Sequence, residues 1–358
     1  MFDVAIIGAG PAGTAAAFDL LVKGLKVLLI DKTEFPRKKA CAGGITPKGY
    51  HRFRYDISSV VKKECHTIKI NPLNQKLFLI NDEKTLCYMT KREELDLFSL
   101  EKVIEKGADF KVIKNIASIN ETPTFVRVNT LGKSFKASYL IGADGANSKV
   151  RQLISKPKFY KKQFALEADL KIDFIDRYPM EFDFSKSKNG YYWIFPKDDH
   201  VNIGMYSTDS NARLNTQKLF EYAKRRFGSK RLEAIKGYPI CTNGFNYRPD
   251  SKRILLVGDA AGLAERLLGE GISFALKSGQ MAAASIIESK TGVVSARDLY
   301  LKKLKEIQAD LRFYDLSAKL FYNFPWLSFK ALPIPFIHKR FVKGYADGKT
   351  IKQILYGG

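Results

Sequence analysis

The glycine-rich turn near the start of the chain constrains the fold more than any other feature. An apolar run, Phe2–Ile7, leads into Gly8, Gly10 and Gly13 with the spacing G-x-G-x-x-G, and a helix-forming run follows from Thr14. Gly8 permits a tight turn, Gly10 lets the backbone approach a pyrophosphate, and Gly13 lets the helix pack closely with its N-terminus toward the anion. The chain is therefore predicted to begin with a Rossmann-type dinucleotide-binding unit.

A second apolar run supports this prediction. Leu25–Ile30 ends in Asp31, about twenty residues beyond the glycines, as such units require. A carboxylate at this position accepts hydrogen bonds from an adenosine ribose and repels a 2′-phosphate. We expect Asp31 and its neighbour Lys32 to lie at the ribose end of a bound nucleotide.

Two later segments repeat the pattern of an apolar strand that enters a glycine turn. One turn carries Asp144 and Gly145, and the other carries Gly258 and Asp259. The second turn is followed by Gly269-Glu-Gly-Ile272 and then by a helix-forming run rich in small residues. These segments resemble the DG and GD motifs of flavin enzymes related to para-hydroxybenzoate hydroxylase.

This resemblance implies one non-covalently bound FAD. In that group the GD aspartate, here Asp259, bonds the flavin ribityl chain, and the DG segment lies beside the cofactor pyrophosphate. The backbone amides of Gly269–Ile272 would lie near the flavin pyrimidine, where negative charge gathers on reduction. A further segment, Thr90–Phe98, is similar to the R-x-x-L/F-D segment of the same group, which implies that Arg92 also contacts the cofactor.

Two more segments narrow the resemblance to the geranylgeranyl reductase family. Phe35-Pro-Arg-Lys-Lys-Ala-Cys-Ala-Gly-Gly-Ile-Thr-Pro47 is similar to the family pattern P-x-x-K-x-C-G-G-G-L. Gly190-Tyr-Tyr-Trp-Ile-Phe-Pro-Lys197, followed by Asn202-Ile-Gly204, is similar to the family's Y-x-W-x-F-P segment and trailing glycine. The likeness extends in outline over nearly the whole chain and implies an FAD-dependent reductase of polyprenyl chains.

Two positions depart from the family pattern. Ala42 stands where the pattern has its first glycine, and Arg266 stands where many relatives carry proline on the substrate side of the flavin. A guanidinium is costly in a purely hydrocarbon pocket. Arg266 therefore either meets an anionic head of the substrate or points away from it.

The aromatic segment alternates as a strand does, with Tyr192 on one face and Tyr191, Trp193 and Phe195 on the other. One face can line an aromatic tunnel across the flavin, which suits a polyprenyl chain. The alternative is that these side chains are simply part of the core.

The reaction implied by the family is hydride transfer from reduced flavin to a carbon–carbon double bond, with a proton delivered to the other carbon. An isolated alkene is a poor hydride acceptor, so an acid is needed nearby. The family loop would set Cys41 close to the isoalloxazine, which makes it the first candidate, with Tyr191 or Tyr192 as substitutes. A buried thiol that serves only in packing is the alternative for Cys41.

These patterns define the expected contacts. Cofactor contacts are expected from Gly8, Gly10, Ala12, Gly13, Asp31, Lys32, Cys41, Ala42, Gly43, Arg92, Asp144, Gly145, Gly258, Asp259, Gly269, Gly271 and Ile272. Substrate contacts are expected from Tyr192, Trp193, Phe195, Pro196 and Arg266, and no metal site is expected.

The expected fold is mixed α/β, with a Rossmann-type FAD-binding domain, an inserted antiparallel-sheet substrate domain and a C-terminal helical segment that is basic and aromatic. Their predicted limits are 1–68, 91–155 and 241–290 for the first, 69–90 and 156–240 for the second, and 291–358 for the third.

The C-terminal segment is expected to begin with an amphipathic helix over Leu299–Tyr322. Beyond it, Pro325, Pro333 and Pro335 are expected to break regular structure.

The formal net charge of +23 over 358 residues narrows the partners. Such a field attracts nucleic acid, anionic membranes or acidic proteins, although a lysine-rich proteome would produce the same bias. The stretch Phe321–Lys352 interleaves aromatic and basic residues, which suits a lipid headgroup interface better than a nucleic-acid groove. We expect a cytoplasmic protein that contacts the inner face of an anionic membrane and binds no nucleic acid.

Two further classes are excluded on sequence grounds. The four cysteines lack CxxC or Cys/His ligand spacing, so reduced thiols are expected rather than a disulfide framework or a structural zinc. The apolar runs are far shorter than the ~20 residues that span a bilayer.

Three functions remain open. The reductase is favoured by the cysteine-glycine loop and the aromatic segment. A flavin monooxygenase that hydroxylates an aromatic or polyketide substrate with NAD(P)H and oxygen would share the fold and all the cofactor motifs. A non-catalytic, flavin-binding membrane adaptor is the third. Because no second G-x-G-x-x-G marks a nicotinamide domain, electrons would come from transiently bound NAD(P)H or from a ferredoxin-like protein.

Overall fold

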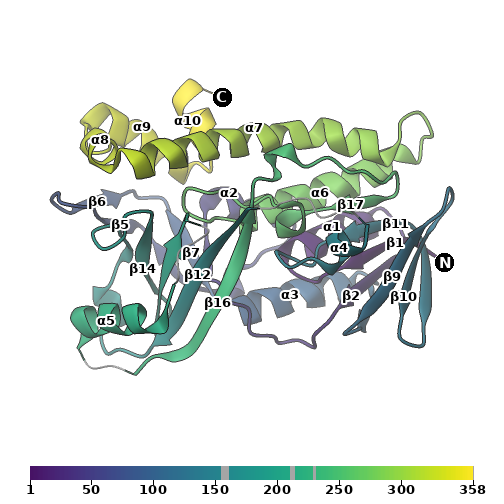
Figure 1. Ribbon diagram of the computed structural model, residues 1–358, viewed down its shortest axis with the longest axis horizontal. Coiled ribbons are helices and arrows are strands. Elements are labelled where there is room, and N and C mark those ends of the chain that lie inside the picture. Colours follow the sequence, from purple (N-terminus) through teal and green to yellow (C-terminus); the bar gives the residue numbers. More distant parts are fainter. Residues whose placement is uncertain (155–160, 210–213, 229–230, 358) are drawn as a thin grey trace.

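The computed structural model describes residues 1–154, 161–209, 214–228 and 231–357. Two large sheets lie beside each other, and the long helix α7 runs across both of them (Figure 1). This arrangement confirms the expected mixed α/β class with a helical C-terminal region.

The strands follow one another along the chain as β1 Phe2–Ile7, β2 Val27–Asp31, β3 Gly44–Ile45, β4 Val61–Cys65, β5 Thr67–Asn71, β6 Phe78–Asn81, β7 Cys87–Thr90, β8 Asp109–Val112, β9 Ile116–Glu121, β10 Val126–Thr130, β11 Ser134–Gly142, β12 Lys161–Leu170, β13 Met180–Asp183, β14 Gly190–Pro196, β15 Val201–Ser207, β16 Glu233–Thr242 and β17 Ile254–Leu256.

The α-helices are α1 Pro11–Val22, α2 Pro47–Tyr50, α3 Arg92–Glu105, α4 Lys149–Ile154, α5 Thr216–Phe227, α6 Ile272–Ser289, α7 Ala296–Asn323, α8 Pro325–Ala331, α9 Pro335–Ala346 and α10 Ile351–Tyr356. Short 3₁₀ helices occur at Ser58–Val60, Ile175–Arg177, Gly244–Asn246 and Gly258–Ala261.

The first sheet has the strand order β8-β2-β1-β11-β10-β9, with β17 paired to the end of β11. Strands β8, β2, β1, β11 and β17 pair in parallel, and β9 and β10 add an antiparallel meander. Helices α1 and α6 pack together, and α7 packs on α6. The central strands read as continuous apolar runs because both faces are covered. The turns that follow β1, β2, β11 and β17 therefore meet at one edge of the sheet, where open α/β sheets bind ligands.

The second sheet has the order β16-β12-β15-β14-β13-β5-β6 and is antiparallel except for the pair β13 and β5. Helix α5 packs on one face of it. Strands β3, β7 and β4 form a small third sheet that the sequence did not indicate. The predicted domain limits stay a prediction, and the limit at 155/156 lies outside the described residues.

The C-terminal segment differs from the expectation. The long helix α7 is present, but Pro325 and Pro335 each stand at the first position of a further helix instead of breaking structure. Proline is well suited to this position, because the first N–H of a helix has no intrahelical partner. The next helices also pack inward, since Phe329 and Val342 belong to the core cluster that contains Trp193.

No helix in the described part of the chain combines the length and the apolar content that a membrane span needs.

Candidate active site

A cavity of about 500 Å³ is lined by the turns at the edge of the first sheet and by one face of the second sheet. It brings together nearly all the predicted site residues, namely Gly8, Gly10, Ala12, Asp31, Lys32, Cys41, Ala42, Gly43, Arg92, Asp144, Gly145, Gly258, Asp259, Gly269, Gly271, Ile272, Tyr191, Trp193 and Phe195. Gly13, Tyr192, Pro196 and Arg266 are not among its lining residues.

The turn between β1 and α1 has the geometry that its glycines predict. Gly8 adopts a φ of 108°, in the region that side chains rarely occupy. A Cβ on Gly13 would overlap the carbonyl oxygen of Gly8, so Gly13 packs the helix against the turn although it does not face the cavity. A Cβ on Gly10 would meet only Nη2 of Arg37, at 3.5 Å, so the turn is open toward the cavity.

Asp31 holds this turn in place. Its Oδ2 accepts a hydrogen bond from the backbone N–H of Ala9 at 2.9 Å, across 22 residues of sequence. Its Oδ1 accepts from the backbone N–H and the hydroxyl of Thr33, at 3.1 and 2.9 Å. The carboxylate is thus fixed where β2 ends, at the rim of the open glycine turn.

Arg92 is fixed by a buried carboxylate. Its Nε and Nη2 donate to the two oxygens of Asp96 at 2.9 Å each, and Nη2 of Arg37 lies 3.1 Å from the same carboxylate. Asp96 is 1% exposed, so one buried negative charge holds two guanidinium groups beside the cavity. Neither Arg37 nor Asp96 was predicted, although Asp96 is the aspartate of the R-x-x-L/F-D pattern.

The DG and GD turns are linked by an arginine that the sequence did not single out. Arg151 donates from Nη2 to the carbonyl of Ala146 at 2.7 Å and from Nη1 to the carbonyl of Ala260 at 2.8 Å. The carboxylate of Asp144 accepts from the backbone N–H groups of Lys149 and Val150, at 2.6 and 3.0 Å. Arg151 therefore ties together the two turns, whose residues Asp144 and Asp259 line the cavity.

Asp259 faces the cavity beside the start of α6. Burial raises its pKa, and the positive charge of Lys39 opposes that rise. The pKa of Lys39 is lowered to about 7 by burial and by the nearby charge of Arg92. The Cβ of a residue at Gly271 would lie 3.3 Å from Oδ1 of Asp259, which keeps this corner narrow.

The aromatic strand β14 presents one face to the cavity. Tyr191, Trp193 and Phe195 line it together with Tyr206 of β15 and Phe182 of β13. The hydroxyl of Tyr191 donates to the carbonyl of Leu268 at 2.5 Å, and burial raises its pKa well above the ordinary value. The wall is apolar except for the hydroxyls of Tyr191 and Tyr206 and the Trp193 indole N–H, and all of these groups donate hydrogen bonds.

Tyr192 lies on the opposite face, where its ring stacks on Tyr222 of α5 with centroids 4.4 Å apart. The alternation of β14 thus places Tyr192 outside the cavity, on the face opposite to the one that a contact with substrate would need. Pro196, the last residue of β14, is next to the lining residue Phe195 but does not itself line the cavity. Arg266 also points elsewhere, because its Nη1 lies 3.2 Å from Oδ1 of Asp315 on α7.

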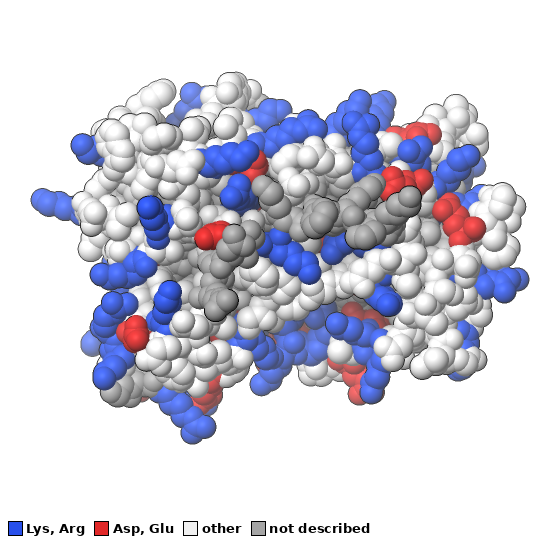
Figure 2. All heavy atoms as spheres, in the orientation of Figure 1, with Lys and Arg blue, Asp and Glu red and all other residues white. Residues whose placement is uncertain are grey.

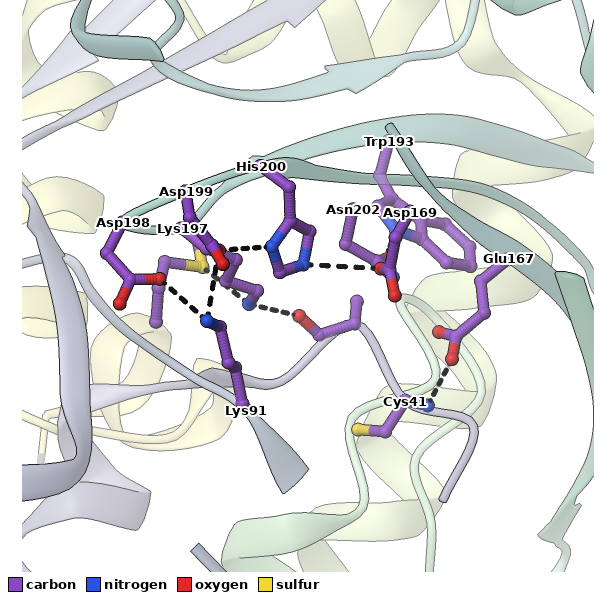
Figure 3. A network of polar contacts seen from close by, with 12 residues as sticks. Cys41, Lys91, Glu167, Asp169, Trp193, Lys197, Asp198, Asp199, His200 and Asn202 are labelled. Atoms are coloured by element: carbon purple, nitrogen blue, oxygen red, sulfur yellow. Dashed lines mark hydrogen bonds and ion pairs between the residues drawn. The ribbon is translucent and has the colours of Figure 1, made fainter. Parts of the chain in front are cut away.

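The Cys41 loop is held by two polar side chains, Glu167 of β12 and Lys197 just after β14, as Figure 3 shows. The backbone N–H of Cys41 donates to Oε1 of Glu167 at 2.8 Å, and Nζ of Lys197 donates to the carbonyl of Ala42 at 2.6 Å. At Gly43, which has a φ of 70°, the carbonyl accepts from the backbone N–H and hydroxyl of Thr90. Glu167 and Lys197 carry no motif that predicts this contact, although Lys197 follows the aromatic segment directly.

These residues fit a bound FAD. The open turn at Gly10 and the N-terminus of α1 can receive a pyrophosphate, and Asp31 lies where a ribose would follow. Asp259 lines the same cavity as the aromatic wall. All four cysteines are free. Within the described ranges, no cluster of histidine, cysteine and carboxylate side chains could hold a metal ion.

Comparison with known proteins places the chain among flavin-type oxidoreductases. Residues 2–156 match the family described as pyridine nucleotide-disulphide oxidoreductase. An uncharacterized protein of Methanosarcina barkeri is 36% identical over 99% of this chain and 93% of its own length. The chloroplastic geranylgeranyl diphosphate reductase of Nicotiana tabacum is 31% identical over 89% of this chain and 75% of its own length. The digeranylgeranylglycerophospholipid reductase of Methanococcus vannielii is 28% identical over 89% and 87%.

Solved structures share the whole fold. A geranylgeranyl bacteriochlorophyll reductase-like protein of Thermoplasma acidophilum has a TM-score of 0.79 at 21% identity and covers 99% of this chain and 94% of its own. A flavin-dependent brominase has a TM-score of 0.77 at 18% identity, over 97% and 93%. Proteins with two different chemistries therefore share this architecture, so the function has to be argued from the residues of the site.

Proposed function

Because the chain belongs to the geranylgeranyl reductase family of FAD-dependent oxidoreductases, we propose that it saturates carbon–carbon double bonds of a polyprenyl lipid. The observation that carries the proposal is a single cavity whose one side is built from the nucleotide-binding turns and whose other side is an aromatic wall. Reduced FAD, when bound, supplies a hydride. The residues described above bind, orient and shield the reactants.

The chain's residues divide this work by position. The turn at Gly10 and Asp31 hold the nucleotide half, and Asp259 holds the part nearest the wall. The rings of Tyr191, Trp193 and Phe195 form a dry surface along which a branched hydrocarbon chain can lie. Such a wall orients an alkene and excludes water, which is what a carbon–carbon reduction needs.

The direct test is product analysis. Purified protein loaded with FAD is mixed with a reductant and a geranylgeranyl lipid, and the lipid is analysed by mass spectrometry with and without oxygen. A gain of two hydrogen atoms per double bond without oxygen supports the reductase. A product that gains an oxygen atom only in air would instead support the monooxygenase.

We also propose a membrane contact for the C-terminal helices. Tyr345 of α9 lines the cavity, and the rings of Phe321 and Phe329 each lie 5.2 Å from Phe184 beneath the helices. These helices therefore cover the apolar end of the cavity. Their other side is exposed and mixes apolar with basic side chains, namely Leu316, Leu320, Phe324, Trp326, Leu327, Ile334, Phe336 and Ile337 with Lys319, Lys330, Lys339 and Arg340.

An exposed apolar surface rimmed by cations matches an anionic lipid interface, and it would bring a lipid substrate to the covered end of the cavity. The variant Leu327→Glu/Phe336→Glu should lose roughly tenfold or more of its binding to anionic liposomes in flotation, since each buried side chain contributes about 1.5–3 kcal/mol. Leu131→Glu is the matched control, because Leu131 is 82% exposed in the turn between β10 and β11. Equal flotation of the two variants would refute the contact.

For the electron donor we propose a small acidic protein, with NAD(P)H as the alternative. On the face in Figure 2, lysine and arginine side chains are more widespread than carboxylates, between areas that carry neither charge. Such a surface attracts an acidic partner, and the attraction falls with salt. Anaerobic flavin reduction by reduced ferredoxin should therefore slow steeply as salt rises. Reduction by NADPH alone at a similar rate would favour the nicotinamide.

A further inference from the structure

Alkene reduction needs a proton as well as a hydride, and the cavity wall contains a candidate for its source. We propose that Glu167 is the catalytic acid that delivers this proton to the substrate double bond. The proposal rests on the proposed function and adds the residue that completes the reaction. It replaces Cys41, Tyr191 and Tyr192 as the expected proton donors.

Glu167 lies in the same row of the second sheet as the aromatic wall. Its register partner on β15 is Gly204, and the partner of Gly204 on β14 is Trp193. Because Gly204 has no side chain, the Trp193 ring lies across it: a Cβ there would be 2.5 Å from Cε2 and Cη2 and closer still to Cζ2. The carboxyl and the indole therefore stand next to each other on the face that lines the cavity.

The other carboxylates of the cavity have different positions or partners. Asp31, Asp144 and Asp259 lie in the three turns that face the nucleotide. Glu270 has its Oε2 2.8 Å from Nζ of Lys48, in an ion pair. Among the described lining residues, Glu167 is thus the acid contributed by the substrate-facing sheet.

The hydrogen bonds of Glu167 suit a neutral carboxylic acid. Oε1 accepts from the backbone N–H of Cys41 at 2.8 Å, as a carbonyl-type oxygen does. Oε2 has no hydrogen-bond partner in the part of the chain that the structure describes, so it is available to carry a proton into the cavity. The Cys41 backbone therefore orients the acid, and the Cys41 thiol is not required for the step.

A second carboxylate on the same face of β12 keeps the proton on Glu167. Burial alone would raise the pKa of Asp169, but hydrogen bonds from His200 and Asn202 outweigh it and lower that pKa (Figure 3). Asp169 therefore stays charged. Burial raises the pKa of Glu167 to about 7, and the charge of Asp169 adds to the rise. Two carboxylates in unequal surroundings thus take opposite protonation states, a common arrangement in acid catalysis.

Cationic groups from the neighbouring elements act against this rise. Lys197 after β14 and Arg92 of α3 lower the pKa of Glu167, as does the hydrogen bond from Cys41. Lys236 of β16 is its other register partner and also lines the cavity. The balance leaves an acid that is about half protonated near neutral pH, where a general acid works best.

The step balances in atoms and electrons. The hydride supplied by the reduced cofactor brings two electrons and forms one new C–H bond. The O–H bond of Glu167 breaks, and its proton forms the second C–H bond at the neighbouring carbon while the π bond is lost. Glu167 is left as a carboxylate, which regains a proton from water when the product leaves.

Glu167→Gln is the sharpest test, because glutamine keeps an oxygen to accept from Cys41 N–H and loses only the acidic proton. Steady-state reduction should fall by about 10²–10⁴-fold, with FAD content and melting temperature unchanged. In the wild type the rate should fall as pH rises through about 7, since Glu167 then loses its proton, and the variant should lack that decline. Glu233→Gln, an exposed change on β16, is the matched control.

Infrared titration gives a readout that does not depend on turnover. Burial also raises the pKa of Glu265 to about 7, so the Glu167 band is read from difference spectra. Subtracting Glu167→Gln from the wild type or from Glu233→Gln should leave the stretch of one protonated carboxyl near pH 6, which disappears above about pH 8. An active wild type whose rate and infrared band are unchanged by Glu167→Gln would overturn the assignment. A wild type that shows the band but reduces no prenyl lipid would instead overturn the proposed function, and with it the role of Glu167.

Discussion

Replacing Gly204 by alanine tests whether the aromatic wall is as tightly built as the structure shows. An ideal Cβ at this position would lie 2.5 Å from Cε2 and Cη2 of Trp193 and closer still to Cζ2. The ring is 4% exposed, and its Nε1 donates to Oδ1 of Asn202 at 2.8 Å. The indole must therefore move into the cavity and give up that hydrogen bond.

The cost follows from these two changes. Overpacking of a filled core costs about 1–3 kcal/mol, and the lost hydrogen bond about 1 kcal/mol. The free energy of unfolding should thus fall by roughly 2–4 kcal/mol, which lowers the melting temperature by about 3–5 °C for a chain of 358 residues. Because the displaced ring also fills the space meant for the substrate, lipid turnover should fall while FAD binding is retained.

Calorimetry of the holoprotein, with flavin absorbance and turnover on the same samples, measures all three quantities. Gly237→Ala is the matched control on β16, where a Cβ would meet its nearest atoms at 3.6 Å, an ordinary contact. That variant should stay within about 0.5 kcal/mol of the wild type. Adding Trp193→Phe to Gly204→Ala should restore part of the lost stability. Equal melting of the two alanine variants would refute the reasoning.

Three further substitutions separate the residues that face the cavity from those that do not. Tyr192→Phe should leave turnover within about twofold of the wild type in the lipid assay, because its ring faces α5, and a loss of a hundredfold would restore it as a proton donor. Arg266→Gln should change the Michaelis constants for phosphorylated and neutral prenyl substrates equally, because its partner is Asp315; a selective loss for the phosphorylated one would contradict that. Gly10→Val should abolish FAD retention on gel filtration, because its side chain would project into the open turn, and normal flavin content would place the pyrophosphate elsewhere.

The nucleotide half of the site could be predicted because its determinants are local. Each turn joins a strand to a following turn or helix within about a dozen residues, so spacing alone placed Gly8, Asp31 and Gly258 together, and all three line the cavity. The strand limits of β1 agree with the predicted apolar run, and α7 agrees with the predicted amphipathic helix.

What the sequence did not reveal depends on long-range packing. Glu167 meets Cys41 across 126 residues, and no periodicity links a strand residue to such a loop. Alternation alone puts Tyr192 and Trp193 on opposite faces of β14 but does not say which face meets the cavity. That depends on which face α5 covers. The expectation that Pro335 breaks regular structure was wrong because proline, which is excluded from the interior of a helix, is favoured at its first position.

Anaerobic flavin reoxidation tests the central claim most directly. The bound flavin is reduced with dithionite, a geranylgeranyl lipid is added, and the return of oxidised flavin absorbance is followed together with the mass of the lipid. We predict reoxidation on addition of the lipid, with one double bond saturated for each flavin reoxidised. Flavin that stays reduced until oxygen is admitted would contradict the reductase and favour oxygen-dependent chemistry.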